Sequence, residues 1–277
     1  MTARVSRVVP PWAHYIVDNL VAGVVTPLRS PRGLWAKRLV PAWRRYAVPA
    51  GIVAVVIAAS MIWLDAPAMR AVATIPHSIT EIFNEITDFG RAGWPLVPIC
   101  ILFFATPFLS SPRLAFMSRG VITTAAVRLG FMFGAIGLTG LADTILKRLI
   151  GRIRPSELGP FAFDPVSWRS AYASFPSGHT TNVFATLVAV GLVFPRARPF
   201  LWIYALVIAV SRVIVSSHYP SDVIAGAAFG AFGAILVRDW FAVRRLGFYV
   251  GSDGAVRLMP GPSFRRIKRV ARALLGQ

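Results

Sequence analysis

The sequence predicts an all-α, polytopic membrane protein, a bundle of six transmembrane helices. Hydrophobic residues make up 56% of its 277 residues. Charged residues make up only 15%, whereas soluble domains carry about 25%. The apolar residues gather in runs close to the roughly 20 residues that cross a bilayer. Most of the net charge of +19 lies at the two ends of the chain.

Six apolar runs are the candidate spans. They are Ala47–Leu64, Trp94–Leu109, Val121–Leu146, Thr180–Phe194, Pro199–Val215 and Val223–Phe241. The first run begins too far along the chain for a cleavable signal peptide, so we expect an uncleaved anchor. A seventh crossing by Trp12–Val25 would change the topology, but that run is short and polar.

Basic residues cluster at both ends of the chain. Residues 1–46 carry eight Lys/Arg and one acid, and residues 238–277 carry nine Lys/Arg and two acids. Because cytoplasmic segments carry the excess of basic residues, we expect both ends in the cytoplasm. The chain then divides into a basic N-terminal segment (1–46), a six-helix domain (47–241) and a basic C-terminal tail (242–277). No basic face interleaved with aromatic residues is present, so nucleic acid is not an expected partner.

Two segments are predicted to lie on the membrane surface. In residues 65–93, an apolar stripe predicts an amphipathic helix on the outer face, and Ser78 with Glu81 predicts a capping box. In the tail, a second stripe with basic residues around it predicts a helix on the anionic inner leaflet; a frayed tail is the alternative. The stripes are Ile79, Ile82, Phe83 and Ile86, and Ile267, Val270, Ala271 and Leu274. Arg128, inside the third span, is expected to snorkel or to pair with another span.

An even number of spans places two polar interruptions, residues 147–179 and 216–222, on the same outer face. The first begins with KRLIGRIRP, in which Lys147 and Arg154 are seven residues apart. Seven helical steps return to within roughly 20° of the start, so both cations are expected on one side. Pro155 disfavours a helical conformation at Arg154 and predicts the helix end there. Taken alone, this pattern is also that of a basic span end.

The motif FPSGHTTNVF precedes the fourth span. Ser177 is the expected N-cap, and the free N–H groups and dipole of the first helical turn form an anion site. Gly178 lets the backbone approach a ligand closely. His179 is placed to give or take a proton near neutral pH. An ordinary capped helix start is the alternative.

The stretch SRVIVSSHYPSD links the fifth and sixth spans. Arg212 ends the fifth span, and His218 and Asp222 follow at a spacing of four residues. In a helical turn, the carboxylate would accept one imidazole N–H and leave the other nitrogen as a nucleophile. A structural salt bridge is the alternative. The three interruptions together predict a phosphate site with a nucleophile and an acid.

These motifs resemble, in order and spacing, the signature of the phosphatidic acid phosphatase type 2 superfamily. They are K-x6-RP at Lys147–Pro155, PSGH at Pro176–His179 and SR-x5-H-x3-D at Ser211–Asp222, and the resemblance covers about residues 94–241. The apolar spans indicate the membrane lipid phosphatase branch of this superfamily. With both ends in the cytoplasm, the site is expected to face the periplasm of a bacterial inner membrane. The resemblance implies a reaction that needs neither a metal nor another cofactor.

The resemblance also implies roles for individual residues. His218 attacks phosphorus and forms a phosphohistidine, Asp222 orients it, and His179 protonates the leaving oxygen. The remaining motif residues bind the phosphate oxygens: Lys147, Arg154, Ser177, Gly178 and Arg212.

The substrate implied is a lipid phosphate or diphosphate such as undecaprenyl diphosphate, lipid A, phosphatidylglycerophosphate or phosphatidic acid. The stretch FNEITDFGRAGWPLVP before the second span is similar to that of bacterial lipid A phosphatases. A lipid phosphotransferase using the same phosphohistidine, or a non-catalytic lipid-phosphate binder, is the alternative. The sequence indicates no oligomeric state.

Overall fold

The computed structural model describes residues 42–109, 116–157 and 161–274, with Ile16, Thr26 and Leu28. The predicted N-terminal segment and the alternative crossing at Trp12–Val25 lie almost wholly outside the described residues. The helices are α3 (Ala42–Trp63), α4 (Asp65–Val72), α5 (His77–Asp88), α6 (Gly93–Leu109), α7 (Phe116–Ile150), α8 (Gly178–Val193), α9 (Arg198–Ile214), α10 (Pro220–Val243) and α11 (Phe264–Leu274). Two short 3-10 turns, η1 (Ser170–Tyr172) and η2 (Pro195–Ala197), and two strands, β1 (Phe248–Val250) and β2 (Val256–Leu258), complete the described part.

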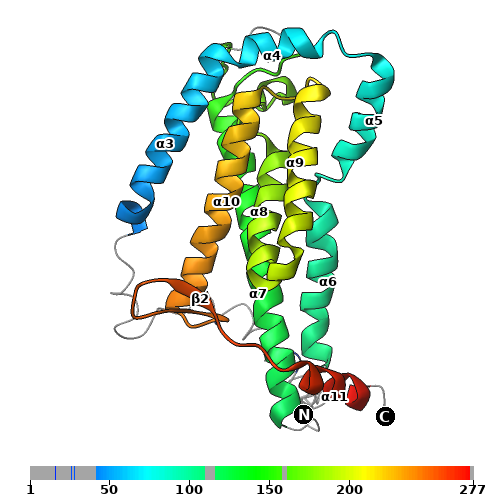
Figure 1. The fold of residues 1–277 in the computed structure, drawn as a ribbon, viewed down its shortest axis with the longest axis vertical. Helices are drawn as coiled ribbons and strands as arrows, with labels where there is room; N and C mark the ends of the chain where they lie inside the picture. The colour runs from blue at the N-terminus through cyan, green and yellow to red at the C-terminus, as the bar shows by residue number, and fades with distance from the viewer. Residues whose placement is uncertain are drawn as a thin grey trace, which may run out of the picture.

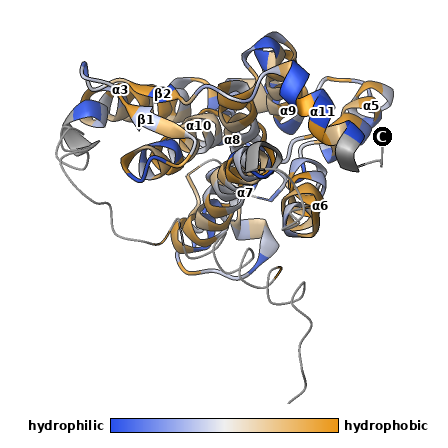
Figure 2. Ribbon diagram, turned by 90° about the horizontal axis from the view of Figure 1, so that it is seen from below, coloured by the Kyte–Doolittle hydropathy of each residue, from blue (hydrophilic) through white to orange (hydrophobic). Residues whose placement is uncertain are grey.

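Helices α7 to α10 pack together as a bundle, with α8 in contact with α7, α9 and α10. Helix α6 lies beside α7, and α3 lies against α10. Helix α4 lies across the end of the bundle at which α9 finishes and α10 begins (Figure 1). The hairpin of β1 and β2 and helix α11 lie at the opposite end. Figure 2 shows hydrophobic residues over much of the helices seen from that opposite end.

The prediction of six spans is confirmed only in part. Among the described residues, five helical segments are long and apolar enough to cross a membrane: Arg45–Trp63, His77–Leu109, Arg119–Ile150, Pro195–Ile214 and Pro220–Val243. The predicted span Thr180–Phe194 forms α8, which has only 16 residues, fewer than the roughly 20 that a span needs. Most of α8 is buried by its neighbours. Its apolar sequence therefore reflects packing inside the protein as well as the membrane.

Two glycines bring α8 and α10 together near the end covered by α4. A Cβ atom on Gly226 would lie 2.5 Å from the carbonyl oxygen of Ser177. One on Gly230 would lie 2.2 Å from that of Thr181. Small residues four apart let two membrane helices approach until their backbones touch. This approach fixes the start of α8 against the start of α10.

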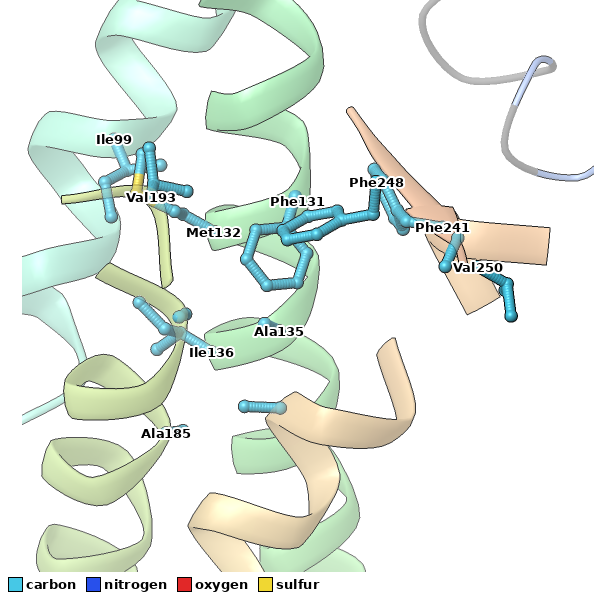
Figure 3. Packing of buried hydrophobic residues seen from close by; sticks show 13 residues of the cluster. Ile99, Phe131, Met132, Ala135, Ile136, Ala185, Val193, Phe241, Phe248 and Val250 are labelled. Atoms are coloured by element: carbon cyan, nitrogen blue, oxygen red, sulfur yellow. The ribbon is translucent and has the colours of Figure 1, made fainter. Parts of the chain in front are cut away.

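A core at the hairpin end shows that the C-terminal residues are not only a basic tail. The Phe131 ring packs edge-on against Phe241 and Phe248, with ring centroids 5.6 and 4.7 Å apart (Figure 3). Phe248 and Val250 of β1 are almost fully buried in this core. The sequence analysis did not predict the hairpin. It makes residues 248–258 part of the folded protein.

Two local predictions, for Arg128 and for the start of α5, can be compared with the structure. Arg128 does not pair with another span, because its Nη2 donates at 3.1 Å to the carbonyl oxygen of Met259, in the loop after β2. The capping box at Ser78 is wrong. Helix α5 begins at His77 after Pro76, and no side chain caps it. Ser78 therefore already lies inside the first turn.

Candidate active site

Three chain segments meet at the end of the bundle that α4 covers. They are the end of α7 with the loop after it, the start of α8, and the turn from α9 to α10. Lys147, Gly178 and His179, from the first two segments, line one cavity of about 360 Å³. The backbone N–H of Ser177 donates to the carbonyl oxygen of Asp222 at 3.0 Å, which joins the second segment to the third.

His218 lies just before α10 and is only 2% exposed. Its Nδ1 lies 2.8 Å from the carbonyl oxygen of Ser174. A carbonyl oxygen can only accept, so Nδ1 carries the proton and, in the neutral ring, Nε2 carries the free lone pair. Burial lowers the pKa of His218 to about 4, against the opposing effect of Asp222. A neutral ring with its proton on Nδ1 keeps the lone pair of Nε2 free, which is the state that a nucleophilic histidine needs.

Asp222 does not make the direct hydrogen bond to His218 that the four-residue spacing predicts. Its Oδ2 lies 3.6 Å from Nδ1 of His218, beyond a normal hydrogen bond. Helix α10 begins only at Pro220, so the two residues do not share a helical turn. Oδ2 instead accepts from the Ser174 hydroxyl at 2.6 Å and from the Tyr219 N–H at 2.9 Å. Ser174 thus links the imidazole and the carboxylate.

The three predicted cations come from three different elements. Helix α7 ends at Ile150, so Arg154 lies in the loop and does not share a helical face with Lys147, contrary to the prediction. Lys147 is held by Asp143 one turn earlier, with Nζ 2.7 Å from Oδ2. Arg212, at the end of α9, donates from Nη1 to the Thr87 hydroxyl at 2.8 Å.

Two of these guanidinium groups have unused buried donors. The Nε atoms of Arg154 and Arg212 are buried and have no hydrogen-bond partner among the described residues. Buried donors nearly always have partners, and leaving one without a partner costs about 1–3 kcal/mol. Oxygen atoms of a bound anion would supply the missing acceptors. A planar guanidinium matches the oxygens of a phosphoryl group, as it matches those of a carboxylate.

The start of α8 has the shape of an anion site. Ser177 is the N-cap residue, as predicted, but its hydroxyl makes no capping bond and accepts from the Thr180 hydroxyl at 3.0 Å. A Cβ on Gly178 would lie 2.6 Å from Nζ of Lys147. Only glycine therefore leaves the lysine its place beside this helix start. The first N–H groups of α8 add positive potential there.

Comparisons with known proteins bear on this arrangement. Residues 128–246 match the PAP2 superfamily. A lipid A 1-phosphatase of Rhizobium etli is 36% identical over 214 residues, which cover 74% of this chain and 90% of the relative. The chain belongs to the PAP2 superfamily. The predicted family and the predicted activity of a multi-pass membrane lipid phosphatase are thereby confirmed.

Two further proteins are similar to this chain. A lipid A 1-phosphatase of Rhizobium johnstonii is 38% identical over 204 residues, 70% of this chain and 80% of the relative. The crystal structure of a PAP2 type phosphatidylglycerolphosphate phosphatase from Bacillus subtilis matches 81% of this chain and 94% of its own, at 20% identity and a TM-score of 0.44.

The PAP2 site includes residues that the sequence analysis did not select. Arg152 donates to Asp222, to Asp65 and to the Ser221 hydroxyl. Thr87 holds Arg212, and Ser174 contacts both His218 and Asp222. Asp65 and Thr87 precede the PAP2-matched residues 128–246. Of these residues, only Arg152 could have been noticed in the sequence. It is an arginine at one of the unspecified positions of the first motif, two residues before Arg154.

Proposed function

We propose that this PAP2 phosphatase removes the 1-phosphate of lipid A. The support is its 36–38% identity to two Rhizobium lipid A 1-phosphatases over most of their length. The cavity beside Lys147 and His179 is also lined by Leu96, Ile136 and Leu141. Apolar helix faces therefore continue directly from the cationic part of the site. A phosphate attached to a lipid matches that combination.

The observation that carries the proposed reaction is a buried imidazole with Nδ1 bonded to a carbonyl oxygen, together with two arginines that have unused buried donors. In the first step, the lone pair on Nε2 of His218 forms a bond to phosphorus. The bond from phosphorus to the lipid oxygen breaks, and that oxygen takes its electron pair and a proton from His179. The negative charge of the bound phosphate favours the protonated form of His179 needed here. Lys147, Arg154 and Arg212 stabilise the charge on the equatorial oxygens.

In the second step, water hydrolyses the phosphohistidine. Water gives a proton to His179 as its oxygen bonds to phosphorus. The bond from phosphorus to Nε2 breaks, and its electron pair returns to the imidazole. Inorganic phosphate leaves, and both histidines regain their initial states. During the covalent stage the ring is positively charged, and Asp222 stabilises it from the Nδ1 side.

We further propose the predicted orientation, with both ends in the cytoplasm and the site facing the periplasm. It requires α8 to act as a sixth crossing despite its 16 residues, shielded from lipid by α7, α9 and α10. The hairpin and α11 are then cytoplasmic. Exposed Phe264 and Ile267 on the basic helix α11 would face an anionic inner leaflet.

Cysteine labelling tests this orientation. In a Cys100→Ser background, a single cysteine replaces exposed Glu157, beside the site, or exposed Ser252, in the hairpin. A membrane-impermeant maleimide is expected to label position 157 in intact cells. It is expected to label position 252 only after the cells are lysed. Labelling of both positions from one side would contradict the six-crossing topology.

The activity is tested with lipid A that carries both the 1- and the 4′-phosphate. Purified enzyme in detergent should release the 1-phosphate alone, as read by mass spectrometry. His218→Ala should lose at least about 10³-fold in kcat, whereas His77→Ala, an exposed histidine on α5, should keep full activity. Undecaprenyl diphosphate and phosphatidylglycerophosphate serve as competing substrates. Preferred turnover of either, or transfer of phosphate to an acceptor lipid, would overturn the assignment.

A further inference from the structure

We propose that Asp65 and Arg152 are positioning residues for the nucleophile, supplied in part by a helix outside the PAP2-matched residues. The inference rests on the proposed role of His218. Asp65 is the first residue of α4, and Arg152 lies in the loop after α7. Both side chains are completely buried. Buried charges of this kind are stable only when they are paired and fully hydrogen-bonded.

Asp65 is hydrogen-bonded through both of its oxygens. Oδ1 accepts from the Ser221 N–H at 3.0 Å. Oδ2 accepts from Nη2 of Arg152 at 2.7 Å and also from the Ser221 hydroxyl. Ser221 is the residue directly before Asp222. Asp65 therefore binds both the backbone N–H and the side chain of Ser221. These contacts fix the first turn of α10, which carries Asp222.

Arg152 connects Asp65 to Asp222. Its Nη1 donates to Oδ1 of Asp222 and its guanidinium stacks 4.3 Å from the centre of the Tyr219 ring. With Oδ1 occupied by Arg152, the other oxygen of Asp222 is the one nearer to His218. The four groups form a row of His218, Asp222, Arg152 and Asp65. The last three have alternating charges, negative, positive, negative.

The alternation of charge gives Asp65 a role in the reaction. When His218 bonds to phosphorus, its ring becomes positive and needs the negative charge of Asp222. Arg152 alone would offset that negative charge and repel the ring. Asp65 neutralises Arg152, so the row keeps one net negative charge to stabilise the phosphohistidine. In a buried site such charges act strongly because water screens them little.

This role predicts a separation between catalysis and phosphate binding. Asp65→Asn should lower kcat about 10- to 100-fold, the effect of losing a charged hydrogen-bond partner. The phosphate-binding side chains Lys147 and Arg212 have other partners, Asp143 and Thr87. The inhibition constant of inorganic phosphate should therefore change by less than about twofold. A change of that size is usual for a substitution that touches none of the binding groups.

The control is Tyr46→Phe. Tyr46 on α3 donates to Oδ2 of Asp239 at 2.7 Å, so it also joins the N-terminal helices to α10, far from the site. Tyr46→Phe is expected to lower the apparent Tm without lowering kcat. If Asp65 served only to attach α4, Asp65→Asn would behave in the same way. A full kcat in folded Asp65→Asn, or a parallel loss of phosphate inhibition, overturns the inference.

A double variant tests the charge argument even if single variants are unstable. Because Asp65 acts by neutralising Arg152, the Asp65→Asn/Arg152→Gln variant should be no slower than Arg152→Gln alone. Additive losses would overturn the proposal. His218→Ala, measured in parallel, separates the two claims. If His218→Ala is active, both the proposed function and this inference are overturned. If His218→Ala is inactive but Asp65→Asn keeps full activity, only this inference is overturned.

Discussion

Thr87 and Arg212 are 125 residues apart in the sequence, and a 2.8 Å hydrogen bond joins the Arg212 guanidinium to the Thr87 hydroxyl. Both side chains are buried. The bond fixes one end of the guanidinium from α5, while its buried Nε has no partner among the described residues. Helix α5, on the periphery of the bundle in Figure 1, therefore orients a side chain that we propose to bind the phosphate.

Thr87→Val removes this bond and nearly keeps the side-chain shape. We expect KM for the lipid substrate to rise roughly tenfold, the effect of losing a hydrogen bond to a charged group, with a smaller change in kcat. Steady-state kinetics in detergent measure both constants. Thr80→Val is the control, because the one hydrogen bond of the Thr80 hydroxyl within the described residues goes to the carbonyl oxygen of Pro76, just before the same helix. Equal effects of the two variants would contradict the role of Thr87.

Gly178→Ala is expected to abolish most of the activity without unfolding the protein. The added methyl group would lie 2.6 Å from Nζ of Lys147 and 3.1 Å from Oδ2 of Asp143, so the lysine must move away from the helix start. We expect a loss of about 10²-fold in kcat/KM, typical of a displaced phosphate-binding group. Gly134→Ala in α7 meets only an ordinary contact at 3.8 Å and should remain active. A fully active Gly178→Ala would show that Lys147 is not needed in its observed place.

The lowered pKa of His218 predicts how stability depends on pH. The native imidazole takes up a proton only near pH 4, whereas an unfolded histidine does so near pH 6.5. Between these values the unfolded state binds the additional proton, so stability is lost as the pH falls from about 6.5 to 4. Above pH 6.5 both states are neutral at this group and the effect vanishes.

The measurement is the apparent Tm of the wild type and of His218→Gln from pH 7.5 to 4. The Tm of the wild type should fall faster than that of the variant, which has no titrating ring. The acid limb of kcat/KM, which reports the free enzyme, should likewise show no loss of the nucleophile until about pH 4. A difference in Tm that stays constant over this range would refute a neutral buried His218.

Chelation of divalent metals is expected to leave hydrolysis unchanged. Lys147, Arg154 and Arg212 are the groups proposed to neutralise the phosphate, the role that Mg²⁺ plays in many phosphoryl-transfer enzymes. Within the described ranges, no three His, Cys, Asp or Glu side chains converge as metal ligands. Initial rates with and without EDTA test this expectation. Loss of turnover on chelation, restored by added Mg²⁺, would contradict it.

The three motifs could be found from the sequence because their spacing is local. The glycine and histidine after Ser177 sit at a helix start, and that kind of site follows from sequence alone. Asp65 and Thr87 could not be found in this way, because their partners lie 87 and 125 residues away. In the sequence, Asp65 is indistinguishable from the exposed acids of the same segment.

Two helix predictions were not confirmed, and each has a physical reason. Apolar composition marked α8 as a span, but composition does not distinguish burial against lipid from burial against protein. The spacing of His218 and Asp222 predicted a shared turn, but Pro220 starts α10 after His218. Nδ1 of His218 donates its hydrogen bond to the Ser174 carbonyl oxygen instead. Backbone groups carry no sequence signal, so this contact was beyond prediction.

The position of Asp65 and Thr87 outside residues 128–246 limits how the enzyme can be rebuilt. A chimera that joins the matched region of this protein to the N-terminal helices of a relative would keep every signature residue. It would keep the hydrogen bonds to Arg152 and Arg212 only if the relative supplies an aspartate and a threonine at the positions of Asp65 and Thr87. Grafting a new lipid preference onto this scaffold therefore requires exchanging α4 and the end of α5 together with the core.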